Sequence, residues 1–157
     1  NDKLLGDGIV INNCYIIDDE FKATNEWSTP WEIDNQSGGI INIKTNVLIV
    51  LNHKMNTDKA GFYGENKYNI GVENGYANYG KKSNNKSGKI YGNQELTILY
   101  HGSGGKRHCL YRGGGIIVIK CNELYNYGNI TCNGDKYSSG GSIFILSKLI
   151  KNYGNIF

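Results

Sequence analysis

The sequence Asn126-Tyr127-Gly128-Asn129-Ile130 occurs a second time as Asn152-Tyr153-Gly154-Asn155-Ile156, which gives a period of 26. A second pair of runs, Gly-Ile-Ile-Val-Ile at 115–119 and Gly-Ser-Ile-Phe-Ile at 141–145, is separated by the same interval. Self-similarity at a fixed period is the signature of a repeat architecture, in which each repeat folds as one unit and stacks on its neighbours. Two separate segments that agree on one period therefore predict a repeat of this length.

The opening of this repeat is also found upstream. Residues 39–43 read Gly-Ile-Ile-Asn-Ile and begin close to three periods before the copy at 115. A fainter copy, Gly-Ile-Val-Ile at 8–11, precedes the copy at 39 by slightly more than one period, which leaves room for a short insertion. When the three clear copies are aligned on their first glycine, two positions are isoleucine each time: Ile41, Ile117 and Ile143, then Ile43, Ile119 and Ile145.

These isoleucine positions predict β-strands. Side chains alternate across a strand, so the Ile-x-Ile pairs give each strand one apolar face. β-Branched residues bounded by glycines do not follow the 3.6-residue period of a helix. One repeat has room for two or three short strands, but a strand–helix–strand unit needs roughly 30 residues or more. We therefore predict an all-β fold, a right-handed parallel β-helix, in which coils stack and like residues lie above like residues.

The length of 157 residues allows a single β-helix domain of about five to six coils over residues 1–157. Residues 1–36 match the repeat less clearly and are predicted to form an N-terminal cap or an atypical first coil. Residues 61–92 depart from the period and contain seven glycines, which predicts a Gly-, Tyr- and Asn-rich loop insertion. A disordered linker is the alternative, but the many aromatic and aliphatic residues of this segment favour an ordered loop.

Composition and charge exclude several classes of function. The formal net charge of +3 is too small to predict nucleic-acid binding, which needs basic residues clustered on one face. The longest apolar run, residues 47–51, is far shorter than the ~18 residues of a membrane-spanning helix. We expect neither a cofactor nor a metal ion. The four cysteines are dispersed, without the paired spacing of a zinc site, and are predicted to be reduced thiols in the core: Cys14, Cys109, Cys121 and Cys132.

Five glycine-rich runs give the chain a family resemblance. They occupy residues 37–41, 89–96, 99–105, 112–117 and 139–143. These runs resemble the glycine-rich β-helix modules of large adhesin-like and surface proteins of bacteria, protists and giant viruses, over roughly residues 37–157. The resemblance implies a location on a virion or cell surface rather than in the cytoplasm. It also implies a structural or attachment role, because such modules rarely carry a defined activity.

Motifs for phosphate and metal chemistry are weak. Residues 75–82 approach the phosphate-binding pattern G-x-x-x-x-G-K-[ST], but Lys82 stands where a hydroxyl is required and no helix can follow. The Gly-Ser-Gly-Gly run at 102–105, followed by Lys106 and Arg107, is either an anion cradle or, as we favour, a tight turn. His53, His101 and His108 share no spacing typical of metal ligands or of a catalytic base.

Two carboxylates are candidates for acid–base catalysis. β-Helix enzymes that cleave polysaccharides resemble the predicted architecture, and glycoside cleavage uses a pair of carboxyl groups at a fixed separation. The only acidic cluster is at residues 18–20, and the alternation along a strand allows only Asp18 and Glu20 to face the same way. A solvated turn explains these residues more simply.

Aromatic residues are the main candidates for ligand binding. Flat aromatic rings beside asparagine amides suit sugars or a protein partner, and the candidate residues are Trp27, Trp31, Tyr63, Tyr68, Tyr76 and Tyr79. Tyr127 and Tyr153, one repeat apart, are instead predicted to stack on each other.

The leading functional hypothesis is a non-enzymatic structural or attachment module that presents a Tyr/Asn-rich surface to a glycan or a protein. The alternatives are a polysaccharide-processing enzyme and a purely structural block of a fibre or shell. Uncapped ends of a solenoid expose strand edges and apolar core. We therefore expect a protein partner, self-association or a larger parent chain to cover the ends.

Overall fold

The structure, a computed structural model, describes residues 9–23, 39–61, 99, 101–102, 112–135 and 138–157. All regular structure in this part of the chain is β-strand, which confirms the all-β class. Long and short strands alternate along the chain: β1 (Ile9–Ile17), β2 (Phe21–Lys22), β3 (Ile40–Val50), β4 (Lys54–Asn56), β5 (Ile116–Asn126), β6 (Asn129–Thr131), β7 (Ser142–Asn152) and β8 (Asn155–Ile156).

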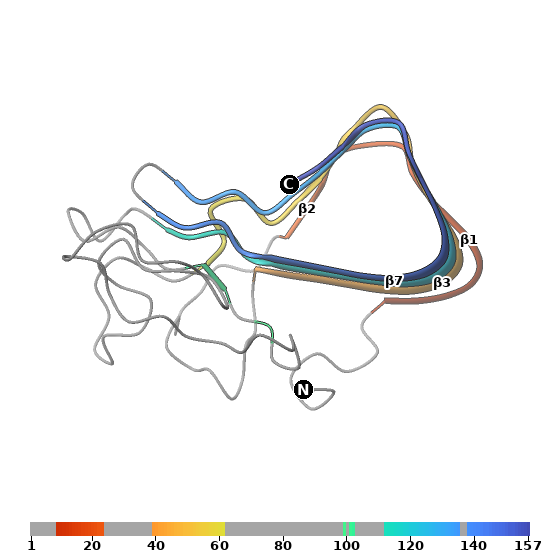
Figure 1. The fold of residues 1–157 in the computed structure, drawn as a ribbon, viewed down its shortest axis with the longest axis horizontal. Helices are drawn as coiled ribbons and strands as arrows, with labels where there is room; N and C mark the ends of the chain where they lie inside the picture. The colour runs from red at the N-terminus through yellow and green to blue at the C-terminus, as the bar shows by residue number, and fades with distance from the viewer. Residues whose placement is uncertain (1–8, 24–38, 62–98, 100, 103–111, 136–137) are drawn as a thin grey trace.

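The strands form two parallel sheets of four strands each. The long strands make one sheet in the order β1-β3-β5-β7, and the short strands make the other in the order β2-β4-β6-β8. Each long strand is followed by a short strand of the other sheet before the chain returns to the first sheet. Figure 1 shows the long strands lying one behind another, bending sharply at the same place and leading on toward the short strands.

The strand register confirms the period of 26. It also shows how the copies at 39 and 115, which are almost three periods apart, are related. Ile117 of β5 pairs with Ile143 of β7, as the repeat predicts. Ile41 of β3 pairs directly with Ile117, although almost three periods of sequence separate them. The interval of almost three periods therefore separates two strands that are direct neighbours in the sheet. The chain between β4 and β5 places no strand between β3 and β5.

The first copy is also shifted from its predicted alignment. Aligning Gly8 with Gly39 would place Ile9 beside Ile40, but Ile9 pairs with Ile43. The register between β1 and β3 then changes again between Ile11 and Cys14, where the ladder has an irregularity typical of a β-bulge. Sequence identity aligns Gly8 with Gly39, whereas the register of paired strands is determined by which side chains form the apolar face.

A core of stacked aliphatic side chains lies between the two sheets. Its fully buried members come from both sheets and include Ile43, Leu48, Met55, Ile119, Leu124 and Ile130. Full burial of one such side chain contributes about 1.5–3 kcal/mol. This core holds the long and short strands together through the same residue positions that the repeat identified as isoleucine.

The first half of β5 is buried on its other face as well. Ile116 and Val118 are 0% and 1% exposed, and they pack with Leu99 in a second cluster outside the main core. Ile40 and Phe144, from the neighbouring strands, pack against the same cluster. The continuous apolar run of β5 therefore serves two cores, as is typical of parallel strands that are covered on both faces.

Polar residues also stack along the sheets. Asn126 Nδ2 donates to Asn152 Oδ1 at 2.8 Å, and Asn155 Nδ2 donates to Asn129 Oδ1 at 2.9 Å. Asn126 is fully buried, and its Oδ1 also accepts a hydrogen bond from the Gly128 backbone. Such pairing removes the cost of burying an amide. The Asn-Tyr-Gly-Asn repeat is thus explained by bonds between successive strand pairs.

The prediction of four core cysteines is only partly right. Cys132 is buried, and Cys121 is half-buried against the main core. The prediction is wrong for Cys14, which is exposed because it lies in the row of Val47 and Glu123, on the face of the sheet away from the main core. Cys109 lies outside the described residues. The three described cysteines are free thiols.

Some predictions concern segments that the structure does not describe. Residues 9–22 of the predicted N-terminal cap include β1 and β2, but most of the predicted insertion at 61–92 lies outside the described residues. Within the described part of the chain, no helix is long and apolar enough to cross a membrane.

Candidate functional site

The predicted aromatic binding residues and the phosphate-loop-like segment lie outside the described residues, namely Trp27, Trp31, Tyr63, Tyr68, Tyr76, Tyr79 and residues 75–82. Tyr127 and Tyr153 are described, and their rings stack with centroids 5.1 Å apart and planes 14° from parallel. This confirms the predicted tyrosine ladder. Both tyrosines remain about half exposed or more, at 47% and 64%.

The carboxylate pair predicted as a catalytic alternative lies in the turn between β1 and β2. Asp18 and Glu20 are both exposed there. Glu20 Oε1 accepts a hydrogen bond from Asn56 Nδ2 at 3.4 Å, and Asp19 Oδ1 accepts one from the Glu20 backbone at 2.7 Å. The first contact attaches the turn to β4, and the second stabilises the turn itself.

The histidine and glycine motifs are only partly described. His101 is fully buried, whereas His53 is exposed in the turn before β4. Gly102 donates its backbone N–H to the Gly114 carbonyl, so this amide is used within the fold. His108, Lys106 and Arg107 lie outside the described residues. No group of three or more potential metal ligands occurs among the residues that the structure describes.

Among the residues that the structure describes, Asp58 is a carboxylate held by several protein contacts. Its Oδ1 accepts hydrogen bonds from the Thr131 hydroxyl at 2.7 Å and from the Asn133 backbone at 2.8 Å, and its other oxygen pairs with Lys54. Burial alone raises the pKa of Asp58, but the hydrogen bonds from Lys54, Thr131 and Asn133 outweigh it and lower the pKa below its usual value. Asp58 is therefore an ionised structural group that joins neighbouring strand pairs.

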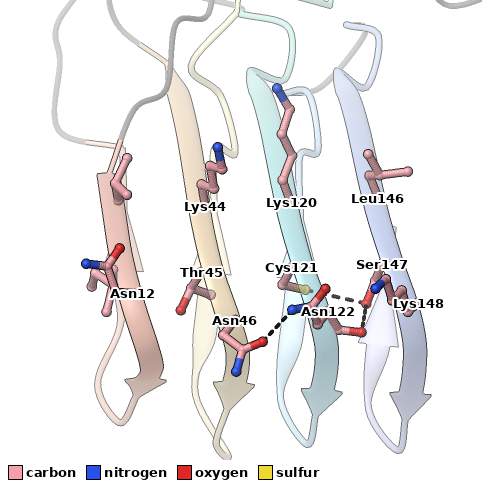
Figure 2. A pocket seen from close by; sticks show the side chains of 12 residues that line it. Asn12, Lys44, Thr45, Asn46, Lys120, Cys121, Asn122, Leu146, Ser147 and Lys148 are labelled. Atoms are coloured by element: carbon pink, nitrogen blue, oxygen red, sulfur yellow. Dashed lines mark hydrogen bonds between the residues drawn. The ribbon is translucent and has the colours of Figure 1, made fainter.

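A groove of about 650 Å³ crosses all four long strands where they bend. We call it the corner groove and define it by residues 10–12 of β1, 44–46 of β3, 120–122 of β5 and 146–148 of β7. Figure 2 shows these four segments side by side. Each segment contributes three consecutive residues to the lining. The repeat therefore builds the corner groove from equivalent positions of successive strands.

Hydroxyl groups of β3 and β7 lie in the wall of the corner groove and contact backbone carbonyl groups. Thr45 Oγ1 lies 3.4 Å from both the Asn13 and Val47 carbonyl oxygens. Ser147 Oγ, at the equivalent position of β7, lies 2.8 Å from the Leu149 carbonyl and 3.1 Å from the Asn122 carbonyl. Short polar side chains that bond to nearby carbonyls compete with regular strand pairing. Thr45 and Ser147 therefore tie this position to nearby backbone, whereas Ile11 of β1 and Cys121 of β5 occupy it without a hydroxyl.

Cys121 occupies the same position on β5. Its Sγ lies 3.5 Å from Ser147 Oγ and is placed to donate a weak hydrogen bond to it. Burial raises the pKa of Cys121, and the contact with Ser147 opposes this only in part. Cys121 is therefore a neutral thiol at neutral pH and belongs to the wall of the corner groove.

The corner groove is positively charged. Lys44 and Lys120 are paired in register on β3 and β5, and Lys148 lies on β7. Like charges opposite each other on neighbouring strands are destabilising. No Asp or Glu is among the lining residues, and none of these lysines has an ion-pair partner among the described residues.

Asparagine amides line the corner groove beside the lysines. Asn46 and Asn122 occupy equivalent positions on β3 and β5, and Asn122 Nδ2 donates to Asn46 Oδ1. Asn12 is the lining amide on β1. In Figure 2 Lys44 and Lys120 lie in one row across the strands, and Asn46 and Asn122 lie in a second row below them. An arrangement of cationic and amide donors suits the carboxylate, sulfate and hydroxyl groups of a ligand.

Sequence analysis did not identify the corner groove. A usable signal was present, because Lys44 and Lys120 hold the same place in their repeats when these are aligned on the first glycine, and so do Asn46 and Asn122. The prediction used only the isoleucine positions of the repeat and not these outward-facing lysines and asparagines. Comparison of the chain with protein-family models, with curated proteins and with solved structures gave no match.

Proposed function

We propose that this chain is a non-enzymatic structural and attachment module, a right-handed parallel β-helix whose side surface binds an extended anionic glycan in the corner groove. The observation that carries the proposal is the array of like lysines and amides on successive strands, at Lys44 and Lys120 and at Asn46 and Asn122.

The strand order supports the β-helix part of the proposal. Consecutive strands alternate between two parallel sheets, and each return to the first sheet places the new strand beside the previous one. This is the connectivity of a coil that advances by one strand spacing per turn, about 4.8 Å. The shared bend and the stacked Asn126–Asn152 pair are what successive coils of one solenoid require.

The corner groove suits a linear polymer better than a compact ligand. It crosses the strands, so a chain lying in it would meet equivalent side chains at steps of about 4.8 Å. An anionic group between Lys44 and Lys120 would relieve their mutual repulsion. An acidic polysaccharide, with carboxylate or sulfate groups and many hydroxyls, satisfies both the lysines and the amides.

The proposal predicts that removing the groove lysines weakens glycan binding. The variant Lys44→Gln/Lys120→Gln should bind a sulfated or uronate-containing polysaccharide at least about tenfold more weakly, which corresponds to about 1.4 kcal/mol. Binding is measured by calorimetry at physiological salt, after the polysaccharide is selected on a glycan array. Weaker binding at higher salt is also expected, because exposed charges are screened.

A matched control removes two positive charges elsewhere. Lys22→Gln/Lys59→Gln changes exposed lysines that do not line the corner groove, and it should leave the affinity within about twofold. Loss of binding in Tyr63→Ala/Tyr68→Ala/Tyr76→Ala together with unchanged binding in the groove variant would transfer the site to the predicted aromatic loop. If no acidic glycan binds the wild-type protein, the attachment role through the corner groove is wrong.

The enzyme alternative is tested with the same ligands. Asp18→Asn removes one of its two proposed catalytic carboxylates from an exposed turn. We expect this variant to bind like the wild type and the polysaccharide to keep its chain length in both cases. Cleavage by the wild type that is lost in Asp18→Asn would replace attachment by catalysis.

A further inference from the structure

Exposed apolar side chains are concentrated at the two ends of the stack of strands. Among the described residues, ten large apolar side chains are exposed, and eight of them belong to the first long strand or to residues 142–157. Ile9, Val10 and Ile16 are on β1, and the other end carries Leu146, Leu149, Ile150, Tyr153 and Phe157. Such clustering marks an interaction surface, whereas scattered exposed apolar residues do not.

The rows of equivalent residues show that these side chains are specific to the ends. One row crosses the sheet through Val10, Lys44, Lys120 and Leu146. Its two inner members are lysines, as a solvated position requires, but its outer members are apolar and 53% and 60% exposed. The row through Cys14, Val47, Glu123 and Leu149 likewise ends in Cys14 and Leu149.

The backbone edges at the two ends are complementary. β1 and β7 are the outer strands of the long-strand sheet, so each has one edge without a partner strand in the described part of the chain. Within a parallel sheet, each strand pairs through one edge with the strand before it and through the other edge with the strand after it. Among the described strands, β1 leaves the first of these edges unpaired, and β7 leaves the second unpaired. A second copy placed with its β1 beside β7 would therefore continue the same ladder.

The charges of the two ends are opposite. Residues 9–23 contain Asp18, Asp19 and Glu20 against the single Lys22. Residues 138–157 contain Lys148 and Lys151 and no acidic residue. In the observed register Lys151 lies in the row of Ile16, two residues before Asp18, so contact between unlike ends places opposite charges near each other. Contact between two like ends opposes charges of the same sign.

We propose that copies of this chain associate head to tail, with the β7–β8 end of one copy against the β1–β2 end of the next. Extension of the observed register places Val10 beside Leu146, Cys14 beside Leu149 and Tyr15 beside Ile150 of the preceding copy. Contact between two different surfaces does not close on itself as a two-fold dimer does, so it generates a filament or a ring. This inference goes beyond the proposed function and does not depend on glycan binding.

A cysteine introduced at the tail tests the register directly. In Leu149→Cys, the new thiol should lie one strand spacing from the native Cys14 of the next copy, about 4.8 Å between the two Cα positions. This separation falls within the range of about 4.4–6.8 Å for disulfides. Mild oxidation should produce a ladder of multimers on a non-reducing gel, while the oxidised wild type stays largely at the mass of one chain.

The matched control for this experiment removes the head thiol. Leu149→Cys/Cys14→Ser should lose the ladder, although it keeps the introduced thiol. Multimers that persist in this double variant, or a Leu149→Cys protein that stays monomeric after oxidation at high concentration, would overturn the proposed head-to-tail register. Leu149 and Cys14 are both exposed, so these changes leave the core intact.

Charge reversal distinguishes head-to-tail contact from contact between like ends. Lys148→Glu/Lys151→Glu and Asp18→Lys/Asp19→Lys should each sediment as monomers, because both ends of each variant then carry the same sign. Mixing the two variants should restore open-ended growth, since both kinds of junction are again complementary. A mixture that stops at dimers would indicate contact between like ends. Wild-type protein that remains monomeric at all concentrations without glycan would overturn the proposal and leave the proposed glycan site untouched.

Discussion

At the scale of single residues, the cysteines show that chemical type does not determine environment. Cys14 and Cys132 both occur among strand-forming residues, yet Cys14 is exposed on the outer strand and Cys132 is 5% exposed. Burial raises the pKa of Cys132 to about 11, with Asp58 adding to the effect and the Gly141 backbone opposing it. Because the thiolate is the reactive form, the two thiols should differ in reactivity.

We predict that Cys14 reacts with a thiol reagent in the native monomer and that Cys132 does not. At pH 8 a thiol with a pKa of about 11 is about 0.1% thiolate, and access to it is also restricted. Reaction of Cys132 should rise with pH toward 11 and should become complete on unfolding in urea. Peptide mapping after labelling measures each site, and Cys14→Ser identifies the fast reaction. Rapid native labelling of Cys132 at pH 8 would contradict its burial.

At the scale of elements, the repeat determines where backbones can approach each other. A Cβ added at Gly141 would lie 1.8 Å from the Gly115 carbonyl oxygen, and one added at Gly115 would lie 2.1 Å from the Gly39 carbonyl oxygen. Gly115 and Gly141, which open two of the repeats, are therefore required by the neighbouring strand pair. This is a packing requirement and differs from the turn role that glycine usually indicates in a sequence.

The adjacent glycine provides a matched test of this packing. Gly141→Ala should destabilise the protein by about 1–3 kcal/mol, because backbone atoms must move to admit the methyl group. Gly140→Ala should be neutral within about 0.5 kcal/mol, since its Cβ would meet its nearest neighbour, the Cys132 carbonyl oxygen, at 3.7 Å. Urea unfolding followed by circular dichroism compares the two variants. Equal stability of both would show that the strand pairs separate easily at Gly141.

The sequence predicted best those strands whose partner in the sheet is a similar repeat one period away in the chain. β5 and β7 lie exactly one repeat period apart in the chain, so comparison of letters found both the strands and their pairing. The pairing of β3 with β5 was not predicted, because the spacing along the chain includes every residue of the segment between them. The corner groove was missed for a related reason. Its lysines and amides come together only after β3 and β5 are neighbours.

At the scale of the whole molecule, position in the stack should determine local stability. In repeat architectures each unit contacts only its neighbours, so inner units are held on two sides and outer units on one. β5 lies between β3 and β7, and its core residues Ile119 and Leu124 are fully buried. In the described part of the chain β7 has a partner strand, β5, on one side only, and residues such as Ile150 on it are 46% exposed.

We therefore predict a gradient of hydrogen exchange that assembly would alter at the ends. In dilute protein, amides of residues 116–126 should exchange most slowly, and alternate amides of residues 142–152 should exchange fast because they face the open edge of β7. At high concentration the exchange of residues 142–152 and 9–17 should slow, while that of 116–126 should change little. Lys148→Glu/Lys151→Glu should keep the dilute pattern at every concentration. Slow exchange in residues 142–152 of dilute protein would mean that this edge is already covered within one chain, and head-to-tail contact would then have no free edge to join.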